Sequence, residues 1–286
     1  MHVDIVTLFP ELFTTFLATS MVGRAVTSKA LTVRLKNPRE FGLGKHRSVD
    51  DTPYGGGSGM LMRVDCLVEC MDSLGVGSER RDAHADVHAS RSAAALKGSE
   101  AAQGAAESAP SLESSEARRG AAETMAACSP RAHRVLMCPQ GTPLTQAKVL
   151  ELAARPALAL VCGRYEGFDE RVRSFVDEEI SLGDFVLTGG EVAAMAILDA
   201  CSRWLPGVLG NAASTSDESH SPAMDGLLEY PQYTRPVEFR GLRVPEVLQT
   251  GNHAAIASFR RAEAERRTVE RRPDLVPRAR KDARDR

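Results

Sequence analysis

Apolar and polar positions alternate with two different periods along the chain, and these periods predict alternating strands and helices. Residues 2–8 form a β-branched, apolar run that Phe9-Pro10-Glu11 interrupts, and residues 12–17 then follow a helical spacing. Residues 31–35 alternate with a period of two, which predicts a strand with one exposed face. The beginning of the chain is therefore expected to fold as strand, helix and strand.

Three further strands are expected later in the chain, each leading into a glycine-bearing loop, over residues 134–141, 157–167 and 179–191. Helices are expected between and after them, over residues 146–154, 169–174 and 192–204. Apolar strands that alternate with helices are typical of a parallel α/β sheet covered on both faces. Because ligands bind where the carboxyl ends of such strands converge, the three loops are expected to surround a binding site.

Two stretches lack this order and divide the chain into parts. Residues 78–130 are rich in alanine and polar residues, contain no aromatic residue and show no sustained apolar period. Such a segment buries too little surface to offset its ordering entropy, so we expect a mostly disordered insertion in a domain that spans residues 1–208. Residues 209–225 are expected to form a flexible linker. Residues 226–286 are predicted to form a helical domain with a basic end.

The composition is that of an ordinary globular protein. Of the 286 residues, 43% are hydrophobic and 26% are charged, and the formal net charge is −2, so a nucleic acid would have to meet a local basic patch. No apolar run approaches the roughly 20 residues of a membrane-spanning helix. The N-terminus has neither the basic start nor the small-residue cleavage site of a signal peptide, and we expect a cytoplasmic protein.

The six cysteines are scattered, and none forms a CxxC pair. Cys138 and Cys162 lie inside apolar runs, so we expect reduced, structural thiols, which suits the cytoplasm. Cys66 and Cys70 are four residues apart and could face one ligand on a helix. Because no second pair of ligands follows them, no metal site is predicted.

The glycine loops carry no signature of a phosphate site. The chain has no GxxxxGK[ST] motif, no GxGxxG after the first strand and no GxSxG or HExxH motif. Residues such as Gln140, Tyr165 and Leu187 flank the glycines, and clusters of lysine or arginine do not. An apolar pocket edged by backbone groups suits a neutral purine or nucleoside better than a phosphate. Any one of these loops could be a simple tight turn, but three at successive strand ends favour a ligand site.

Nine motifs occur in an order that resembles one known family. They are VTLFPELF, GRAV, HRSVDDTPYGGGSGMLM, CPQG, LVCGRYEGFDERV, SLGDFVLTGGE, SRWLPGVLGN, LLEYPQYTRP and VPEVLQTGNHAAI. Together they resemble the bacterial tRNA (guanine-N1)-methyltransferase family, TrmD, over residues 1–75 and 134–275. Each motif alone is weak, whereas the ordered set is specific.

The resemblance implies a SPOUT fold, an α/β domain with a parallel sheet and a C-terminal trefoil knot, followed by a small helical C-terminal domain that binds tRNA. General topology rules alone would argue against a knot. It further implies a homodimer with the active site at the subunit interface. The implied reaction transfers a methyl group from S-adenosylmethionine to N1 of guanosine 37 of tRNA, next to the anticodon, when another G precedes it.

The resemblance also assigns roles to the loops. The residues implied to bind S-adenosylmethionine are Met137, Cys138, Pro139, Gly141, Gly163, Tyr165, Glu166, Leu182, Gly183, Asp184, Phe185, Val186 and Leu187. The residues implied to meet the tRNA are Arg24, His46, Arg47, Asp50 and Gly59, together with the basic C-terminal helices. Without the resemblance, Asp184 would be an ordinary turn residue, and residues 46–51 would be a turn with an Asx cap.

Methylation of guanine N1 needs a base, because N1 carries a proton at neutral pH, and a cation that stabilises charge developing on O6. The resemblance gives the cationic role to Arg203. The family's general base is an Asp directly followed by Ser in the linker, whereas here Glu218 precedes Ser219 and Asp217 lies one position earlier. Glu218 is favoured by its alignment position, and Asp217 is the alternative.

Two other functions stay open on the sequence alone. A SPOUT methyltransferase for another RNA, such as ribosomal RNA, is disfavoured because the DDTPYGGGSGM loop and the separate C-terminal region resemble the tRNA enzyme. An RNA-binding protein that has lost catalysis is favoured only by the glutamate at position 218. Mapped primer-extension stops would test the first alternative, and donor binding without turnover would support the second.

Overall fold

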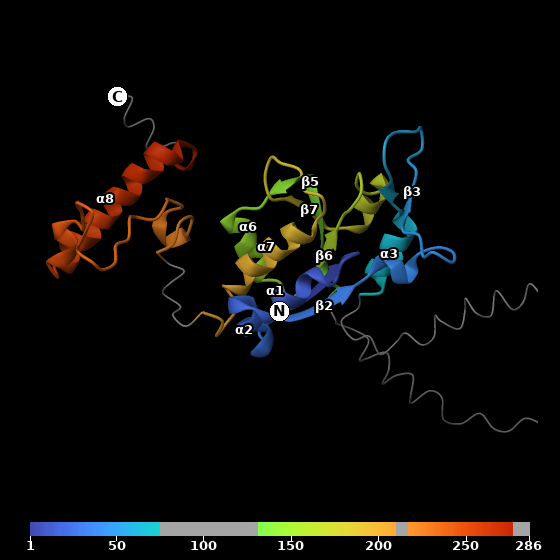
Figure 1. Cartoon of the computed structure of the whole chain (residues 1–286), viewed down its shortest axis with the longest axis horizontal. Helices are drawn as coiled ribbons and strands as arrows, with labels where there is room; N and C mark the ends of the chain where they lie inside the picture. The colour runs from blue at the N-terminus through green and yellow to red at the C-terminus, as the bar shows by residue number, and fades with distance from the viewer. Residues whose placement is uncertain (75–130, 210–216, 277–286) are drawn as a thin grey trace, which may run out of the picture. The chain divides into compact units, whose positions relative to one another are not determined.

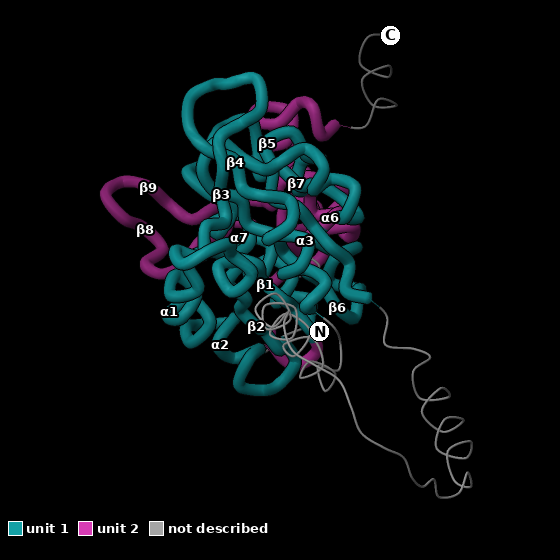
Figure 2. The backbone as a smooth tube through the Cα atoms, turned by 90° about the vertical axis from the view of Figure 1, so that its right-hand side faces the viewer, with its two compact units in different colours: residues 1–144, 149–205 teal, residues 145–148, 206–286 magenta. Residues whose placement is uncertain are grey.

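The computed structural model describes residues 1–74, 131–209 and 217–276. The expected insertion at 78–130 lies outside the described residues. Two compact units divide the chain: residues 1–144 and 149–205 form unit 1, and residues 145–148 and 206–286 form unit 2, as the two colours of Figure 2 show.

The elements of unit 1 combine strands, α-helices and 3₁₀ helices, the last labelled η. They are β1 (His2–Val6), α1 (Leu12–Ala18), α2 (Ser20–Thr27), β2 (Thr32–Lys36), η1 (Pro38–Phe41), β3 (Asp50–Asp51), β4 (Leu61–Met62), α3 (Val64–Asp72), β5 (His133–Pro143), α6 (Gln146–Ala153), β6 (Ala157–Cys162), η2 (Glu170–Phe175), β7 (Glu178–Ser181) and α7 (Glu191–Ser202). The first residues of α6 count with unit 2.

Unit 1 is built on a five-stranded sheet with the strand order β2-β1-β6-β5-β7. Its pairings are parallel, and every residue of β6 is buried, as a central strand with two covered faces requires. The expected parallel α/β sheet is therefore confirmed.

Helices cover the two faces of this sheet. Helix α3 packs on the face that carries Val6, Leu136 and Val161. Neighbouring residues of each strand point to the opposite face. Helix α7 contacts β6, α1 and α2, and Figure 1 shows α3 and α7 on opposite sides of the sheet. This layering leaves the carboxyl ends of β5, β6 and β7 side by side at one edge.

Three expected segments differ from the structure in their extent or in their type. The Pro/Gly turn expected to end a strand at 139–141 is instead a bulge inside β5, where its register against β7 shifts between Met137 and Thr142. A glycine is required at 141, because a Cβ there would lie 2.5 Å from the backbone nitrogen of Ile180. The segment 179–191 is a strand only as far as Ser181, and the short helix expected at 169–174 is the 3₁₀ helix η2.

Within the described ranges, the cysteines at positions 66, 70, 138, 162 and 201 are buried and form no disulfide bond. Burial raises the pKa of the Cys66 thiol to about 11 and that of the Cys201 thiol to about 12. Both therefore stay protonated at neutral pH, the form that neither attacks an electrophile nor binds a metal. Cys66 and Cys70 pack with α3 into the core, which accounts for their helical spacing without a metal.

Unit 2 contains the long helix α8 (His253–Arg271), the hairpin strands β8 (Glu238–Phe239) and β9 (Leu242–Arg243), and the 3₁₀ helices η4 (Pro222–Met224), η5 (Glu246–Gln249) and η6 (Pro273–Leu275). The side chain of Asn252 caps α8 by accepting the Ala255 N–H at 3.2 Å. Residues 217–225, part of the expected linker, form turns and η4. Across the ranges that the structure describes, no helix has the length and apolar character of a membrane crossing.

Candidate functional site

The loops that follow β5, β6 and β7 surround a pocket of about 140 Å³. They meet because the three strands are neighbours and pair in register: Met137 of β5 lies opposite both Cys162 of β6 and Ile180 of β7. Ten of the residues expected to bind the methyl donor line this pocket: Met137, Cys138, Pro139, Gly163, Tyr165, Glu166, Leu182, Phe185, Val186 and Leu187. The convergence of these loops is what the sequence pattern predicted.

Two glycines let the loops approach one another closely. The Gly190 N–H donates to the Gly163 carbonyl at 2.9 Å, and a Cβ at Gly190 would lie 2.8 Å from the Cα of Cys162. A Cβ at Gly163 would lie 2.3 Å from the ring of Phe168. Larger residues would push the loops apart, so these glycines are required by packing as well as by the turns.

The mouth of the pocket is apolar and exposed. Val186 is 84% exposed and Phe185 is 56% exposed, and Tyr165 stands beside them with a left-handed backbone, at φ 60°. Exposed apolar side chains around a cavity are typical of a surface that another molecule covers. The walls offer apolar contacts and backbone groups, which suit a flat, uncharged ring.

Three expected donor-binding residues lie beside the lining described above. Gly141 belongs to the bulge of β5 against β7. Gly183 is held by Ser181, whose hydroxyl accepts the Gly183 N–H at 3.1 Å and donates to the Gly183 carbonyl at 3.0 Å. Asp184 follows as an exposed residue of the same turn. These residues shape the loop that carries Phe185 and Val186.

A buried acid that the sequence analysis did not single out contacts Arg164, one of the residues that line the pocket. Glu191, the first residue of α7, is 1% exposed and accepts the Thr7 hydroxyl of the β1 end at 2.9 Å. Its other carboxylate oxygen lies 3.0 Å from Nε of Arg164, an ion pair whose N–H is not aligned for a hydrogen bond. The guanidinium stacks on the ring of Phe9 at 4.5 Å and lines the pocket.

Glu191→Leu should lower the free energy of unfolding by about 2–3 kcal/mol, less than for a fully buried ion pair because Arg164 is partly exposed. Arg164 would lose the carboxylate with which it forms an ion pair, and the Thr7 hydroxyl would lose its acceptor. Denaturant unfolding measures the change. The control is Glu151→Leu, which breaks an exposed i, i+4 pair with Arg155 and should cost under about 0.5 kcal/mol. Equal stability of the two variants would contradict the role of the buried pair.

The glycine-rich loop between β3 and β4 is joined to the pocket by backbone hydrogen bonds. The Glu166 N–H donates to the Met60 carbonyl at 3.0 Å, and the Met62 N–H donates to the Gly167 carbonyl at 2.9 Å. Gly59 lies so close that a Cβ there would be 2.4 Å from Cγ of Glu166. The structure therefore brings the expected substrate residue Gly59 close to the residues that line this pocket.

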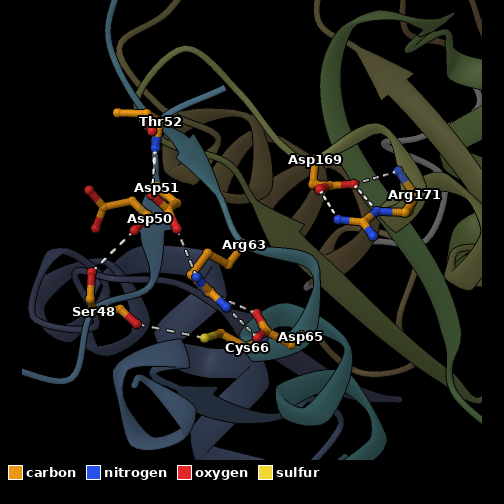
Figure 3. A network of polar contacts seen from close by, with 9 residues as sticks. All are labelled: Ser48, Asp50, Asp51, Thr52, Arg63, Asp65, Cys66, Asp169 and Arg171. Carbon is orange, nitrogen blue, oxygen red and sulfur yellow. Dashed lines mark hydrogen bonds and ion pairs between the residues drawn. The ribbon is translucent and has the colours of Figure 1, made fainter. Parts of the chain in front are cut away.

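Polar contacts fix the base of this loop (Figure 3). Arg63 pairs with Asp51 at 2.9 Å and with Asp65 at 2.7 Å, and its hydrogen bonds lower the pKa of the Asp65 carboxyl. The Ser48 hydroxyl donates to the backbone carbonyl of Asp50 at 3.2 Å, and Asp169 holds Arg171 at the start of η2. Asp50 thus lies in a fixed strand, β3, next to a loop of glycines.

The other expected tRNA-contacting residues lie away from the pocket lining. His46 and Arg47 are exposed in a turn, where Arg47 has φ 50° and its N–H donates to the Gly44 carbonyl at 3.2 Å. Arg24 is exposed on α2. Exposed positions of this kind are available to a nucleic-acid phosphate, but their geometry alone does not select one.

The expected catalytic residues belong to different units. Arg203 directly follows α7 in unit 1 as its C-cap residue and is half-buried. Asp217 and Glu218 belong to unit 2. The backbone carbonyl of Glu218 accepts the Ser221 N–H at 3.1 Å. Each unit is described by itself, so the contact between the cation and the acids stays a prediction.

Comparison with known proteins identifies similar chains across nearly the whole length. Residues 1–97 and 114–278 match the family described as tRNA (Guanine-1)-methyltransferase TrmD. A tRNA (guanine-N(1)-)-methyltransferase of Sorangium cellulosum is 64% identical over 98% of this chain and 95% of its own length. Enzymes of the same description from Syntrophotalea carbinolica and Geotalea uraniireducens are 42% and 43% identical, over 98% and 100% of this chain and 91% and 94% of their own lengths.

Proposed function

Because the chain belongs to the TrmD family and is a tRNA (guanine-N1)-methyltransferase, we propose that it methylates N1 of guanosine 37, next to the anticodon, with S-adenosylmethionine as the donor. The observation that carries the proposal is the 64% identity over 98% of the chain, together with the pocket formed by three strand-end loops. Because the proposed substrate is a tRNA, the proposed location is the cytoplasm.

The pocket fits S-adenosylmethionine on three counts. Its apolar walls and backbone groups suit the uncharged adenine ring. Glu166 and Arg164 are among the residues that line it, and an acid and a cation of this kind would complement the ammonium and carboxylate of an amino-acid moiety. Gly163 and Gly190 allow the loops to approach each other closely, and closely spaced loops could contact both faces of a flat ligand. When bound, this donor supplies a methyl group on a positively charged sulfur.

The chain's own residues would then prepare the acceptor nitrogen. Arg203 would stabilise the negative charge that develops on guanine O6 as N1 loses its proton. Glu218 would take that proton, with Asp217 as the alternative base. The loop that contains Gly59, which follows Asp50 of β3, borders the pocket and would position the nucleotide, because the backbone of residues 60 and 62 bonds residues 166 and 167.

We also propose the trefoil knot of the family for unit 1. Strand β5 separates β6 from β7, yet the chain that leaves β7 returns to the end of β6, where Gly190 bonds Gly163. The segment after β7 therefore crosses the end of β5. A chain that is threaded through a loop makes a crossing of this kind. The knot would also hold the three pocket loops together.

The test uses donor labelled in its methyl group and tRNA transcripts with G at positions 36 and 37. The expected result is label transfer and a primer-extension stop at position 37, since methylated N1 blocks base pairing. Transcripts with A at position 37, or with A at position 36, are the controls and should accept little label. Transfer to ribosomal RNA instead, or donor binding without transfer to any tRNA, would overturn the proposal.

A homodimer is proposed because exposed apolar side chains gather from segments near the pocket. Leu12 of α1 is 48% exposed and Val192 of α7 is 58% exposed, and these two helices contact each other. Val186, at the pocket mouth, is 84% exposed. A second copy that covers these residues would complete the active site, which explains why they are apolar.

Leu12→Asp should therefore shift the protein from dimer to monomer at micromolar concentration, because a carboxylate would be buried in the interface. Sedimentation velocity measures the change. The control is Leu43→Asp, since Leu43 is 49% exposed and lies in the loop after η1; it should stay a dimer. A wild-type monomer that still methylates tRNA would contradict the proposed dimer.

A further inference from the structure

Arg164 and Glu191 join two of the chain segments that line the pocket. Arg164 belongs to residues 163–168, which follow β6, and residues 185–190 lie directly before Glu191. Nε of Arg164 lies 3.0 Å from the carboxylate of Glu191, and Nη1 of Arg164 donates to the Thr188 carbonyl at 3.3 Å. The guanidinium of the first segment therefore contacts the second segment and the residue that follows it.

The end of β1 adds further contacts to this pair. The Thr7 hydroxyl donates to the Glu191 carboxylate at 2.9 Å and accepts the Phe9 N–H at 3.0 Å. The ring of Phe9 lies against the guanidinium of Arg164, whose central carbon is 4.5 Å from the ring centre. Starting from Phe9, the contacts thus pass through one hydroxyl, one carboxylate and one guanidinium and return to Phe9.

Glu191 is the buried member of this circuit. It is 1% exposed, whereas the side chain of Arg164 is 22% exposed. A Cβ at Gly189 would lie 2.3 Å from Nε of Arg164 and 2.5 Å from Oε2 of Glu191, so the glycine leaves the space that the ion pair occupies. A buried ion pair adds little net stability compared with apolar packing, because both charges lose hydration. The other effect of the fixed carboxylate is geometric, since it determines where the guanidinium lies.

We propose that Glu191 is a positioning residue for the methyl donor: through Arg164 it holds residues 163–168 and 185–190 in the arrangement that binds S-adenosylmethionine. This inference rests on the proposed function, in which this pocket holds the donor. A pocket whose loops are already in place binds its ligand at a lower ordering cost. Loss of the carboxylate therefore weakens donor binding and leaves the methyl-transfer step unchanged once the donor is saturating.

The test separates donor affinity from the rate of transfer. Glu191→Gln removes the charge that faces Arg164 but keeps the side-chain shape and an amide oxygen for the Thr7 hydroxyl. Calorimetric titration with S-adenosylmethionine should give a Kd about 10-fold above that of wild type, on the scale of one interaction with a charged group. Thr7→Val removes only the hydroxyl and should raise the Kd about 3-fold. The single-turnover rate at saturating donor should stay within about 3-fold of wild type in both variants.

The matched control is Glu151→Gln, which removes the charge of an exposed glutamate paired with Arg155 and should keep the wild-type Kd. The calorimetric stoichiometry reports the folded fraction, so a loss of folded protein is not mistaken for weaker binding. Hydrogen exchange of the donor-free protein is a readout independent of activity. The Gly190 N–H, which donates to the Gly163 carbonyl at 2.9 Å, should exchange about 10-fold faster in Glu191→Gln than in wild type.

Each outcome decides one question. If Glu191→Gln binds the donor with the wild-type Kd, its role is structural only and the inference is wrong, even where the variant is less stable. A fall in the saturated transfer rate as large as the loss of affinity would also contradict it, because Glu191 would then act on the reaction. If the wild-type protein does not bind S-adenosylmethionine, the proposed function fails, while the exchange of the Gly190 amide still shows whether Glu191 holds the two segments together.

Discussion

Glu218→Gln should slow single-turnover methyl transfer to tRNA by about 100- to 10,000-fold, the usual contribution of a general base. Glutamine keeps the length and shape of the side chain but cannot accept the N1 proton. Donor binding should be unchanged, because the pocket proposed for the donor is lined by residues of unit 1. The measurement is the transfer rate at saturating donor and enzyme, with donor affinity measured separately by calorimetry.

A pH series sharpens this prediction. As the pH rises, guanine N1 begins to lose its proton without help, so Glu218→Gln should regain part of its rate relative to wild type. The control is Glu229→Gln. This glutamate is half-buried and its backbone N–H donates to the Ser219 hydroxyl, next to Glu218, and its variant should stay within a few-fold of the wild-type rate. If Glu218→Gln keeps the full rate and Asp217→Asn is inactive, Asp217 is the base. If both keep the full rate, neither carboxylate is.

Arg203→Ala should lower the transfer rate by about 100- to 1,000-fold, with little change in donor affinity. The guanidinium stabilises charge that appears on guanine O6 only as the reaction proceeds. Its removal should therefore raise the energy of the transition state and leave that of the ground state unchanged. Arg203→Lys should recover part of the rate, since lysine keeps the charge but not the planar fork of donors. Single-turnover kinetics and calorimetry separate the two effects.

The control for Arg203 is Arg155→Ala, an arginine at the end of α6 whose partner is the exposed Glu151. Its loss should change the transfer rate by less than about 3-fold, because an exposed ion pair contributes little. A loss of donor affinity in Arg203→Ala as large as its loss of rate would show that Arg203 belongs to the donor site and not to the guanine site.

Local patterns in the sequence predicted several elements closely, although the strand predicted over 179–191 ends at Ser181. The apolar run at 157–162 became β6, with every residue buried, and the spacing at 192–204 became α7, Glu191–Ser202. Helix and strand periods are properties of short segments, so they can be read without knowing what the segment packs against. The glycines at the strand ends are local signals of the same kind, and they predicted the pocket.

The sequence failed where a residue's role depends on a distant neighbour. Glu191 reads as an ordinary first-turn acid of a helix, and only the tertiary structure puts it against Thr7, 184 positions away, and against Arg164. The bulge at 139–141 likewise looked like a turn, because nothing local shows that β7 lies alongside and that the pairing resumes at Thr142.

By itself, then, the sequence determined the parallel α/β class, the three loops and, through its ordered motifs, the family. Only the tertiary structure decided the strand order β2-β1-β6-β5-β7 and the contacts of the buried Glu191 with Thr7 and Arg164. The physical reason is range: periodicity and turn chemistry act between residues a few positions apart, whereas strand pairing and buried charge pairs join segments whose separation in sequence leaves no local trace.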